Sequence, residues 1–504
     1  MNSLRQLFEL KRIIDNFGNK TSKSLFSPTS KNNQLSQLAR KIAAPGKPNE
    51  REWAMEICQT NPSDQTYIRI RSQLKRRLLG SLFHLEIRTG SEFRKALYRS
   101  AKDVFCIRML LVFGARGFAI WLIPLALERA RNYELTQDQI ELLQLLRQDA
   151  TIKGLRKQFA QYVEELDEAL ILRSAEIKVQ GLDDEINVEL VGKAYISKKA
   201  TALIKSARPE AAAIFAQHPT FNIGLSYYRI ASLAAESGDD SRLCFDLCTQ
   251  AETFLARFPH LNTPLYIGQF AIKRLSSAIA IQDFASARNA VEVCEQCFPE
   301  TTNNWFIWKE SELHLLLHSN AWAEAGALHR QITTHERFGM QPEQVQQMWA
   351  LLGHYTSFAT WAQERSTSEA EAKHFNIVLD EVTIYKRDKA GYNAALYILQ
   401  YLILASRADF DGLIKKSEAI VKYMDRYMRG RHETQLFGFL KTLVLLNKYD
   451  YDLDRTRKRA RRYIEQFLHI GRENVDEAQT LRYDLMWQWI CQWMGTKMGA
   501  KPLK

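Results

Sequence analysis

Cysteine and histidine pairs are the residues of this chain whose types and spacing could support chemistry. The pairs are Cys244 with Cys248, Cys294 with Cys297, and His314 with His318. A C-x-x-C pair in a zinc site needs a second ligand pair on a tight loop, whereas both cysteine pairs here fall in the middle of expected helices. The two histidines have the spacing of a helical metal site, but the sequence indicates no third ligand. We therefore expect no metal site.

Other motifs with a known chemical role are also missing from the sequence. The stretch VFGARGF, residues 112–118, has neither the lysine of a phosphate-binding loop nor the glycine spacing of a dinucleotide-binding turn. Neighbouring carboxylates such as Glu164 and Glu165 lie in charged stretches that are typical of a solvated helix face. No Ser/His/Asp or Cys/His set is indicated. The sequence thus predicts a non-enzymatic protein with no catalytic residue and no cofactor.

The elements that position these residues are expected to be helices. The chain has 504 residues, of which 46% are hydrophobic, and only 12 are proline and 22 glycine. A β-rich protein needs a turn about every 8 to 12 residues, so this sparse punctuation favours long helices. The sequence therefore predicts an all-α protein.

Turn signals recur at a regular distance in the C-terminal half. They lie near residues 236–240, 281–284, 318–322, 364–368, 407–411 and 447–451. A spacing of about 40 residues is a repeat signature, and each unit would hold two antiparallel helices.

Residues after these turns resemble the second helix of a tetratricopeptide repeat, over residues 221–470. Asp283 and Phe284 match the family's turn, Ala287 and Cys294 its small packing positions, and Pro299 its closing proline. Further matches are Trp322 and Ala325 in the next unit and Cys244 and Ala251 in the preceding one, while Leu413 replaces a small residue. The resemblance implies a right-handed superhelix, a TPR-like solenoid of helix pairs. No residue of the family's peptide-carboxylate clamp can be transferred to this sequence.

The small residues offer a structural explanation for the thiols. A second helix must lie close to its neighbours, and cysteine is a small side chain that is easily buried. We therefore expect Cys244 and Cys294 to pack between helices. Seven scattered cysteines without a dense framework also favour reduced thiols and a cytoplasmic setting.

The N-terminal region is the most basic part of the chain. Residues 1–90 hold 16 Lys and Arg against seven Asp and Glu. Helices over 50–58 and 64–86 have the outline of a helix-turn-helix, and Ser63 or Asp64 can cap the second. The candidate nucleic-acid contacts are Arg69, Arg71, Gln73, Lys75, Arg76 and Arg77. The alternative is an amphipathic packing helix with a basic edge, buried through a stripe that includes Tyr67, Ile70, Leu74 and Leu78.

Two further surfaces stand out near the C-terminus. The segment RTRKRARRY supplies six more candidate anion contacts, Arg455, Arg457, Lys458, Arg459, Arg461 and Arg462. The alternative is a solvated helix of the final repeat. In the last helix, Met486, Ile490 and Trp493 share one face and are expected to cap the repeats. Trp487 falls on another side and is a candidate for partner binding.

Residues 109–127 form the most apolar stretch near the N-terminal region. Arg116 lies near its centre, and its unfavourable transfer of about 2.5–3.5 kcal/mol nearly offsets the apolar residues around it. We therefore expect a turn between two buried helices rather than a membrane span. Whether this stretch is a helical hairpin or is associated with a membrane is left open by the sequence.

These features divide the chain into a basic region 1–90, a helical region 91–220, repeats 221–470 and a capping helix with a tail 471–504. The leading expectation is a scaffold or adaptor that binds a protein or peptide through the solenoid surface. The first alternative is a nucleic-acid-binding regulator that uses the N-terminal segment and keeps the repeats as a sensor. The second is a membrane-associated assembly factor. The sequence does not identify the partner, the pathway or the oligomeric state.

Overall fold

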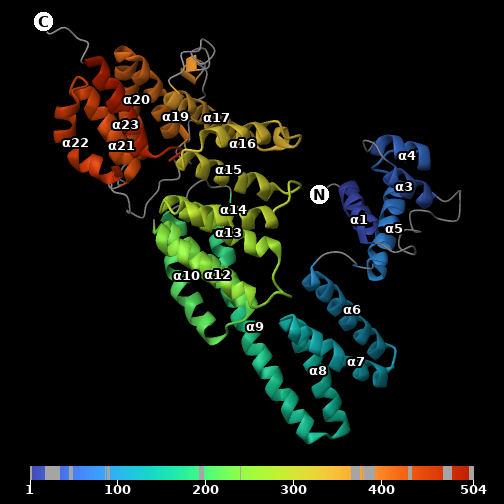
Figure 1. Ribbon diagram of the computed structural model, residues 1–504. Helices are drawn as coiled ribbons and strands as arrows, with labels where there is room; N and C mark the ends of the chain where they lie inside the picture. The colour runs from blue at the N-terminus through green and yellow to red at the C-terminus, as the bar shows by residue number, and fades with distance from the viewer. Residues whose placement is uncertain are drawn as a thin grey trace. The chain divides into compact units, whose positions relative to one another are not determined.

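The structure is a computed structural model in which the chain divides into two compact units, Met1–Leu170 and Ile171–Lys504 (Figure 1). The structure describes residues 3–17, 34–44, 49–85, 87, 91–191, 198–238, 240–364, 375–376, 378–379, 392–428, 434–468 and 479–498. These residues form α-helices and two short 3-10 helices, and no β-strand occurs among them. The all-α prediction is therefore confirmed for the described part of the chain.

The first unit begins with a small body of four helices around one apolar core. Its helices are α1 (Ser3–Phe17), α3 (Gln34–Ala43), α4 (Glu50–Cys58) and α5 (Gln65–Ser81). Asn49 and Asp64 cap α4 and α5, because each side chain accepts a hydrogen bond from a backbone N–H of the first turn. The expected stripe of α5 is buried in this core. The helix ends at Ser81 rather than at 86, and residues 82–84 continue as a short 3-10 helix, η2.

The rest of the first unit is a set of antiparallel helices. It contains α6 (Glu92–Val112), α7 (Arg116–Asn132), α8 (Thr136–Lys153) and the first part of α9 (Arg156–Leu190). The turn expected within 109–127 is present between α6 and α7. The expectation of two buried helices is only partly right, because α7 buries Ile123 and Leu127 but leaves Phe118, Trp121 and Leu125 exposed. Among the described helices, α6 and α8 are the ones that pack extensively against α7, and the outer face of α7 is exposed.

The second unit continues as helices that pack against their sequence neighbours. After the remainder of α9 come α10 (Lys198–Gln217), α11 (Phe221–Ser237), α12 (Ser241–Ala256), α13 (Pro264–Ala280), α14 (Phe284–Cys297), α15 (Asn303–His318) and α16 (Trp322–Thr333). Helix α13 contacts α15 as well as α14, so the first helices of successive pairs also touch. Adjacent helix pairs of this kind are consistent with an all-α solenoid.

The same type of hydrogen bond closes eight of the described helix-to-helix turns, in both units. In each turn a backbone N–H donates to the carbonyl five residues earlier, at 2.8–3.1 Å. The donors are Ala115, Leu135, Leu155, Asp240, Asp283, Ala321, Asp409 and Tyr451. The residue before the donor has a left-handed backbone in each turn where it is described, as at Gln282, Asn320 and Ala408. This is the Schellman geometry, which satisfies the last carbonyls of a helix.

Five of the six predicted turns are confirmed by these bonds and boundaries. The exception is 364–368: α17 ends at Glu364 and residues 365–368 lie outside the described residues. The same turn geometry also recurs about every 20 residues in 91–170, at Ala115, Leu135 and Leu155. The regular build therefore begins earlier in the chain than the turn signals alone predicted.

Small residues let the paired helices approach closely, as expected. Cys244 and Cys294 are buried in α12 and α14, and neither is in a disulfide. Glycines play the same part on the first helices: a Cβ on Gly224 would lie 2.2 Å from the Phe254 ring, and one on Gly268 would lie 2.3 Å from Phe298. Such distances leave no room for a side chain, so both positions require glycine.

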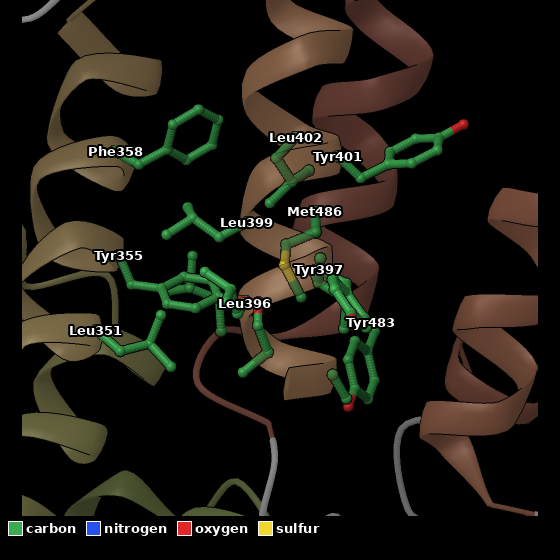
Figure 2. Close-up of a cluster of buried hydrophobic side chains, with 14 of the residues drawn as sticks. Leu351, Tyr355, Phe358, Leu396, Tyr397, Leu399, Tyr401, Leu402, Tyr483 and Met486 are labelled. Atoms are coloured by element: carbon green, nitrogen blue, oxygen red, sulfur yellow. Dashed lines mark hydrogen bonds between the residues drawn. The ribbon is translucent and has the colours of Figure 1, made fainter. Parts of the chain in front are cut away.

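The C-terminal part closes around one apolar helix. Its helices are α17 (Glu343–Glu364), α19 (Tyr392–Arg407), α20 (Phe410–Tyr427), α21 (Gln435–Lys448), α22 (Leu453–Leu468) and α23 (Tyr483–Met498), with the short helix η3 (Phe338–Met340) before α17. Every residue of α19 from Asn393 to Ala405 is buried. Figure 2 shows α19 between α17, which contributes Tyr355 and Phe358, and α23, which contributes Met486.

Helix α23 does more than cover the last helix pair. It contacts both α19 and α22. Its Trp489 ring lies 6.5 Å from Trp322 and 6.1 Å from Phe358, and the Trp493 ring lies 6.0 Å from Phe358. The end of the chain thus returns to α16 and α17 and completes their core.

Candidate interaction surfaces

The cysteines lie where packing, not ligation, explains them. Burial raises the pKa of Cys294 to about 12, and burial also raises the pKa of Cys297. Cys248 donates a hydrogen bond to Cys244, which lowers the pKa of Cys244 and raises that of Cys248. Within the described ranges, no group of three or more His, Cys, Asp or Glu is arranged to hold a metal ion.

The histidine pair of α15 is an internal contact. Burial lowers the pKa of both His314 and His318 to about 4, so both rings are neutral near pH 7. The Nε2–H of His318 donates to the carbonyl of Gln479, at 2.9 Å. This bond joins α15 to the segment that leads into α23. His318 is therefore a structural residue that links distant parts of the chain.

A row of polar and aromatic side chains, partly exposed except for the buried Asp183, runs across the first helices of the second unit. Arg229 on α11 donates from Nε to Gln269 on α13 at 3.0 Å, and its guanidinium lies 5.8 Å from the Tyr266 ring centre. Asp183 on α9 pairs with the same arginine at 3.4 Å, and Lys273 on α13 pairs with Glu236 on α11 at 2.5 Å. These four contacts connect α9, α11 and α13, and we call this row the first-helix face.

The first-helix face was not predicted from the sequence. Its polar residues lie on the first helices, whereas the family resemblance concerned the second helices. One signal was present: Arg229 and Lys273 lie 44 residues apart, which is close to the repeat period. Polar residues that recur at the period of a solenoid would mark a shared face.

Helix α5 separates its candidate contacts into two groups. Arg69, Gln73, Arg76 and Arg77 are exposed, and none of these arginines has an ion-pair partner among the described residues. Arg71 instead donates to Glu50 at 2.6 Å, and Lys75 donates to Gln6 at 2.7 Å. The latter two therefore help to hold α5 against α4 and α1.

The body around α5 is more complete than the sequence indicated. Helices α1 and α3 both contact α5, and α3 contacts α4. The helix-turn-helix outline of α4 and α5 was predicted from the sequence, but the core that they share with α1 and α3 was not. With these supports, the exposed basic face of α5 is held by a folded body.

Helix α22 exposes all six of its candidate basic residues. Its buried face consists of Thr456, Ala460, Ile464 and Phe467. The basic residues outside that face are Arg455, Arg457, Lys458, Arg459, Arg461 and Arg462. Arg461 pairs with Glu465 at 2.8 Å, and Arg457 lies 3.7 Å from Asp454. Lys458 and Arg459 have no ion-pair partner in the part of the chain that the structure describes.

The structure corrects the expectation for Trp487. This side chain is 5% exposed and belongs to the large C-terminal core. Met486 and Ile490 are also buried, while Trp489 and Trp493 are partly buried against the same core. Because α23 is enclosed from several sides, its second face is not open to a partner, and Trp487 is a core residue.

The apolar stretch 109–127 is divided between α6 and α7. None of the helices in the described segments has both the length and the apolar character to cross a bilayer.

Comparison with known proteins adds no relative: no family model matches the chain, and no curated protein or solved structure matches it significantly.

Proposed function

We propose that this chain is a non-enzymatic helical-repeat scaffold that binds a protein or peptide on its first-helix face. We further propose that its helix pairs form a superhelix like that of tetratricopeptide repeats. The proposal is supported chiefly by one observation: partly exposed polar and aromatic side chains of α11 and α13 lie in a row that is tied to α9 through the buried Asp183.

The chemistry of this row suits a polar extended ligand. Solenoids use such surfaces for recognition through many weak contacts. Arginine and tyrosine are among the residues that contribute most at protein interfaces. Arg229 and Lys273 are each paired with a carboxylate of the same face, and Tyr266 and Gln269 supply a ring and an amide. Because these charges balance, peptides with polar, uncharged side chains that can hydrogen-bond and pack against a ring are the ligands that this set would favour.

The test compares two surfaces of the full chain. A peptide library is selected against the wild type, and the affinity of each selected peptide is then measured for Tyr266→Ala with Gln269→Ala. The matched control is Gln250→Ala with Thr253→Ala on the exposed side of α12. We expect the first variant to bind the peptides about tenfold more weakly or worse, as for loss of interface anchors. The control variant should bind them with the affinity of the wild type. Equal affinities for both variants would reject the first-helix face.

The second candidate is a nucleic-acid-binding protein, and it is favoured by the folded body that presents α5. In helix-turn-helix proteins the second helix enters the major groove while neighbouring helices support it. Here Arg69, Gln73 and Arg76 share the outer face of α5, opposite the buried stripe.

A salt titration of duplex DNA binding tests this candidate. The variant is Arg69→Ala with Arg76→Ala and Arg77→Ala, and the control is Lys458→Ala with Arg459→Ala. Each lost phosphate contact should reduce the slope of log affinity against log salt by about 0.9. A wild type that does not bind duplex DNA at low salt would exclude this role, and a weakened control would move the site to α22.

A further inference from the structure

Two hairpin tips lie together at one end of the helices of the first unit. The α6–α7 turn and the α8–α9 turn share this end because the successive helices run antiparallel (Figure 1). Arg116 at the start of α7 donates from Nε and Nη2 to Asp149 near the end of α8, at 3.2 Å. Lys153 pairs with the same carboxylate at 2.7 Å. The shared Asp149 therefore connects the two tips.

Both tips expose apolar side chains. Phe113 is 82% exposed and Ile152 is 65% exposed. The full set is Val112, Phe113 and Phe118 on one tip and Ile152, Leu155 and Phe159 on the other. All residues from 151 to 161 are exposed, so the second tip projects from the bundle. Apolar side chains grouped in this way on a protein surface indicate an interaction site.

The same tips carry an excess of positive charge. Their cations are Arg116, Lys153, Arg156 and Lys157, against the single carboxylate of Asp149. Arg156 and Lys157 are exposed and have no ion-pair partner among the described residues. These two directly follow Leu155 in the sequence. The apolar and cationic groups thus lie on the same turns.

We propose that this end of the first unit docks on the surface of an anionic phospholipid bilayer. A bilayer offers phosphate groups directly above hydrocarbon, which matches apolar side chains flanked by cations. Neither signal alone gives stable attachment, whereas apolar insertion combined with a basic patch does. The contact is interfacial, in keeping with the lack of a spanning helix in the described segments.

Vesicle flotation with the full-length protein tests the proposal. The vesicles are phosphatidylcholine alone or phosphatidylcholine mixed with phosphatidylglycerol. We expect flotation with the anionic vesicles and little with the neutral ones. Arg156→Gln with Lys157→Gln removes two charges, each of which should weaken binding about fivefold. Ile152→Ser with Leu155→Ser should reduce flotation to the background level.

Matched controls use exposed residues of the second unit. Ile307→Ser with Ile414→Ser controls for apolar loss, and Lys458→Gln with Arg459→Gln controls for charge loss. Both controls should float like the wild type. The proposal is overturned if the wild type ignores anionic vesicles, if the tip variants float unchanged, or if the α22 control loses binding as much as the tip variants. Unchanged circular dichroism of every variant would confirm that the substitutions leave the fold intact.

Discussion

Helices α7 and α19 are both rich in apolar residues, yet they end in opposite surroundings. In α19 every residue from Asn393 to Ala405 is buried, including polar Asn393 and Gln400. In α7, Trp121 is 70% exposed and its ring stacks on Phe118 at 5.5 Å. The side chains of α19 are almost all buried, whereas one face of α7 is exposed to solvent.

The number of packing partners explains this difference. Helix α19 contacts α17, α20 and α23, so apolar neighbours lie on several sides. Its polar groups are satisfied as well, since Gln400 donates to the carbonyl of Val378 at 2.9 Å. Helix α7 packs extensively against just two of the described helices, α6 and α8. Composition alone does not decide burial, because the tertiary neighbours of a helix determine which of its faces is covered.

The sharpest contrast comes from truncating a leucine of α19. Leu402 is fully buried, and Leu402→Ala should lower the free energy of unfolding by about 2–5 kcal/mol through lost transfer energy and a cavity. Urea unfolding followed by circular dichroism measures this change. Leu402→Met, which nearly conserves volume, should cost less than about 1.5 kcal/mol. A loss below 1 kcal/mol for the alanine variant would contradict a tightly packed α19.

Acid should destabilise the core around α19 and α23 through His318. Its pKa is about 4 in the folded chain and about 6.5 when unfolded, so between these values the unfolded state binds more protons. The contribution of neutral His318 to the free energy of unfolding is fully present above about pH 6.5. It is lost as the pH falls toward 4, and this loss is at most about 3 kcal/mol. Glu310 opposes this trend, because burial raises its pKa to about 7.

Urea midpoints at neutral pH and near pH 5 measure the effect for the wild type and for His318→Gln. The glutamine amide can still donate to the Gln479 carbonyl but does not titrate. The variant should therefore lose less stability in acid than the wild type does. Identical acid losses in the two proteins would show that His318 is not the group responsible.

Two glycine-to-alanine substitutions should change the free energy of unfolding in opposite directions. Gly268→Ala places a Cβ against Phe298 and 3.0 Å from Cys297 Cβ, so overpacking should cost about 1–3 kcal/mol. Gly117→Ala in α7 meets nothing within 4 Å and should stabilise the helix by about 0.5–1 kcal/mol. Thermal unfolding of both variants checks the signs. A destabilised Gly117→Ala would indicate that something covers this part of α7.

The smallest effect is expected on the exposed face of α7. Trp121→Ala and Leu125→Ala remove side chains that are largely in solvent, so each should change the free energy of unfolding by less than about 0.5 kcal/mol. Urea unfolding of each variant, beside Leu402→Ala, completes the comparison. A loss above 2 kcal/mol for either residue would mean that this face is buried in solution.

The sequence predicted helices, turns and small packing residues because these depend on local chemistry. Asp283 and Asp409 cap their helices in the structure because a side-chain oxygen can reach a nearby N–H whatever lies around it. Within 91–170 the turn at Ala115 was predicted, but the turns at Leu135 and Leu155 were not. Glu134, which precedes Leu135, is an unusual residue for a left-handed backbone. The return of α23 to α16 and α17 was also missed, because contacts between distant parts of a chain leave no periodic mark.

The exposure of the candidate contact residues was predicted correctly for some and wrongly for others, because it depends on the helices that pack nearby. A helical pattern correctly placed Tyr67 inside and Arg69 outside, because α5 packs on one side only. It could not show that Arg71 would pair with Glu50, which lies 21 residues away. It misplaced Trp487 because α23 packs on more than one side and leaves only the face of Gln488 and Gln492 exposed. A periodic pattern predicts which face of a helix a residue occupies, but it does not indicate how many other helices pack against that helix.

The enclosure of α19 has a consequence for how the protein is made. Helix α19 leaves the ribosome before α23 has been synthesised. The apolar surface of α19 that packs against α23 therefore stays uncovered until α23 is made. A transcript cut short before residue 479 would yield a product with that surface uncovered, which exposes it to aggregation and to cellular quality control. Completion of the C-terminal core therefore depends on translation reaching its final segment.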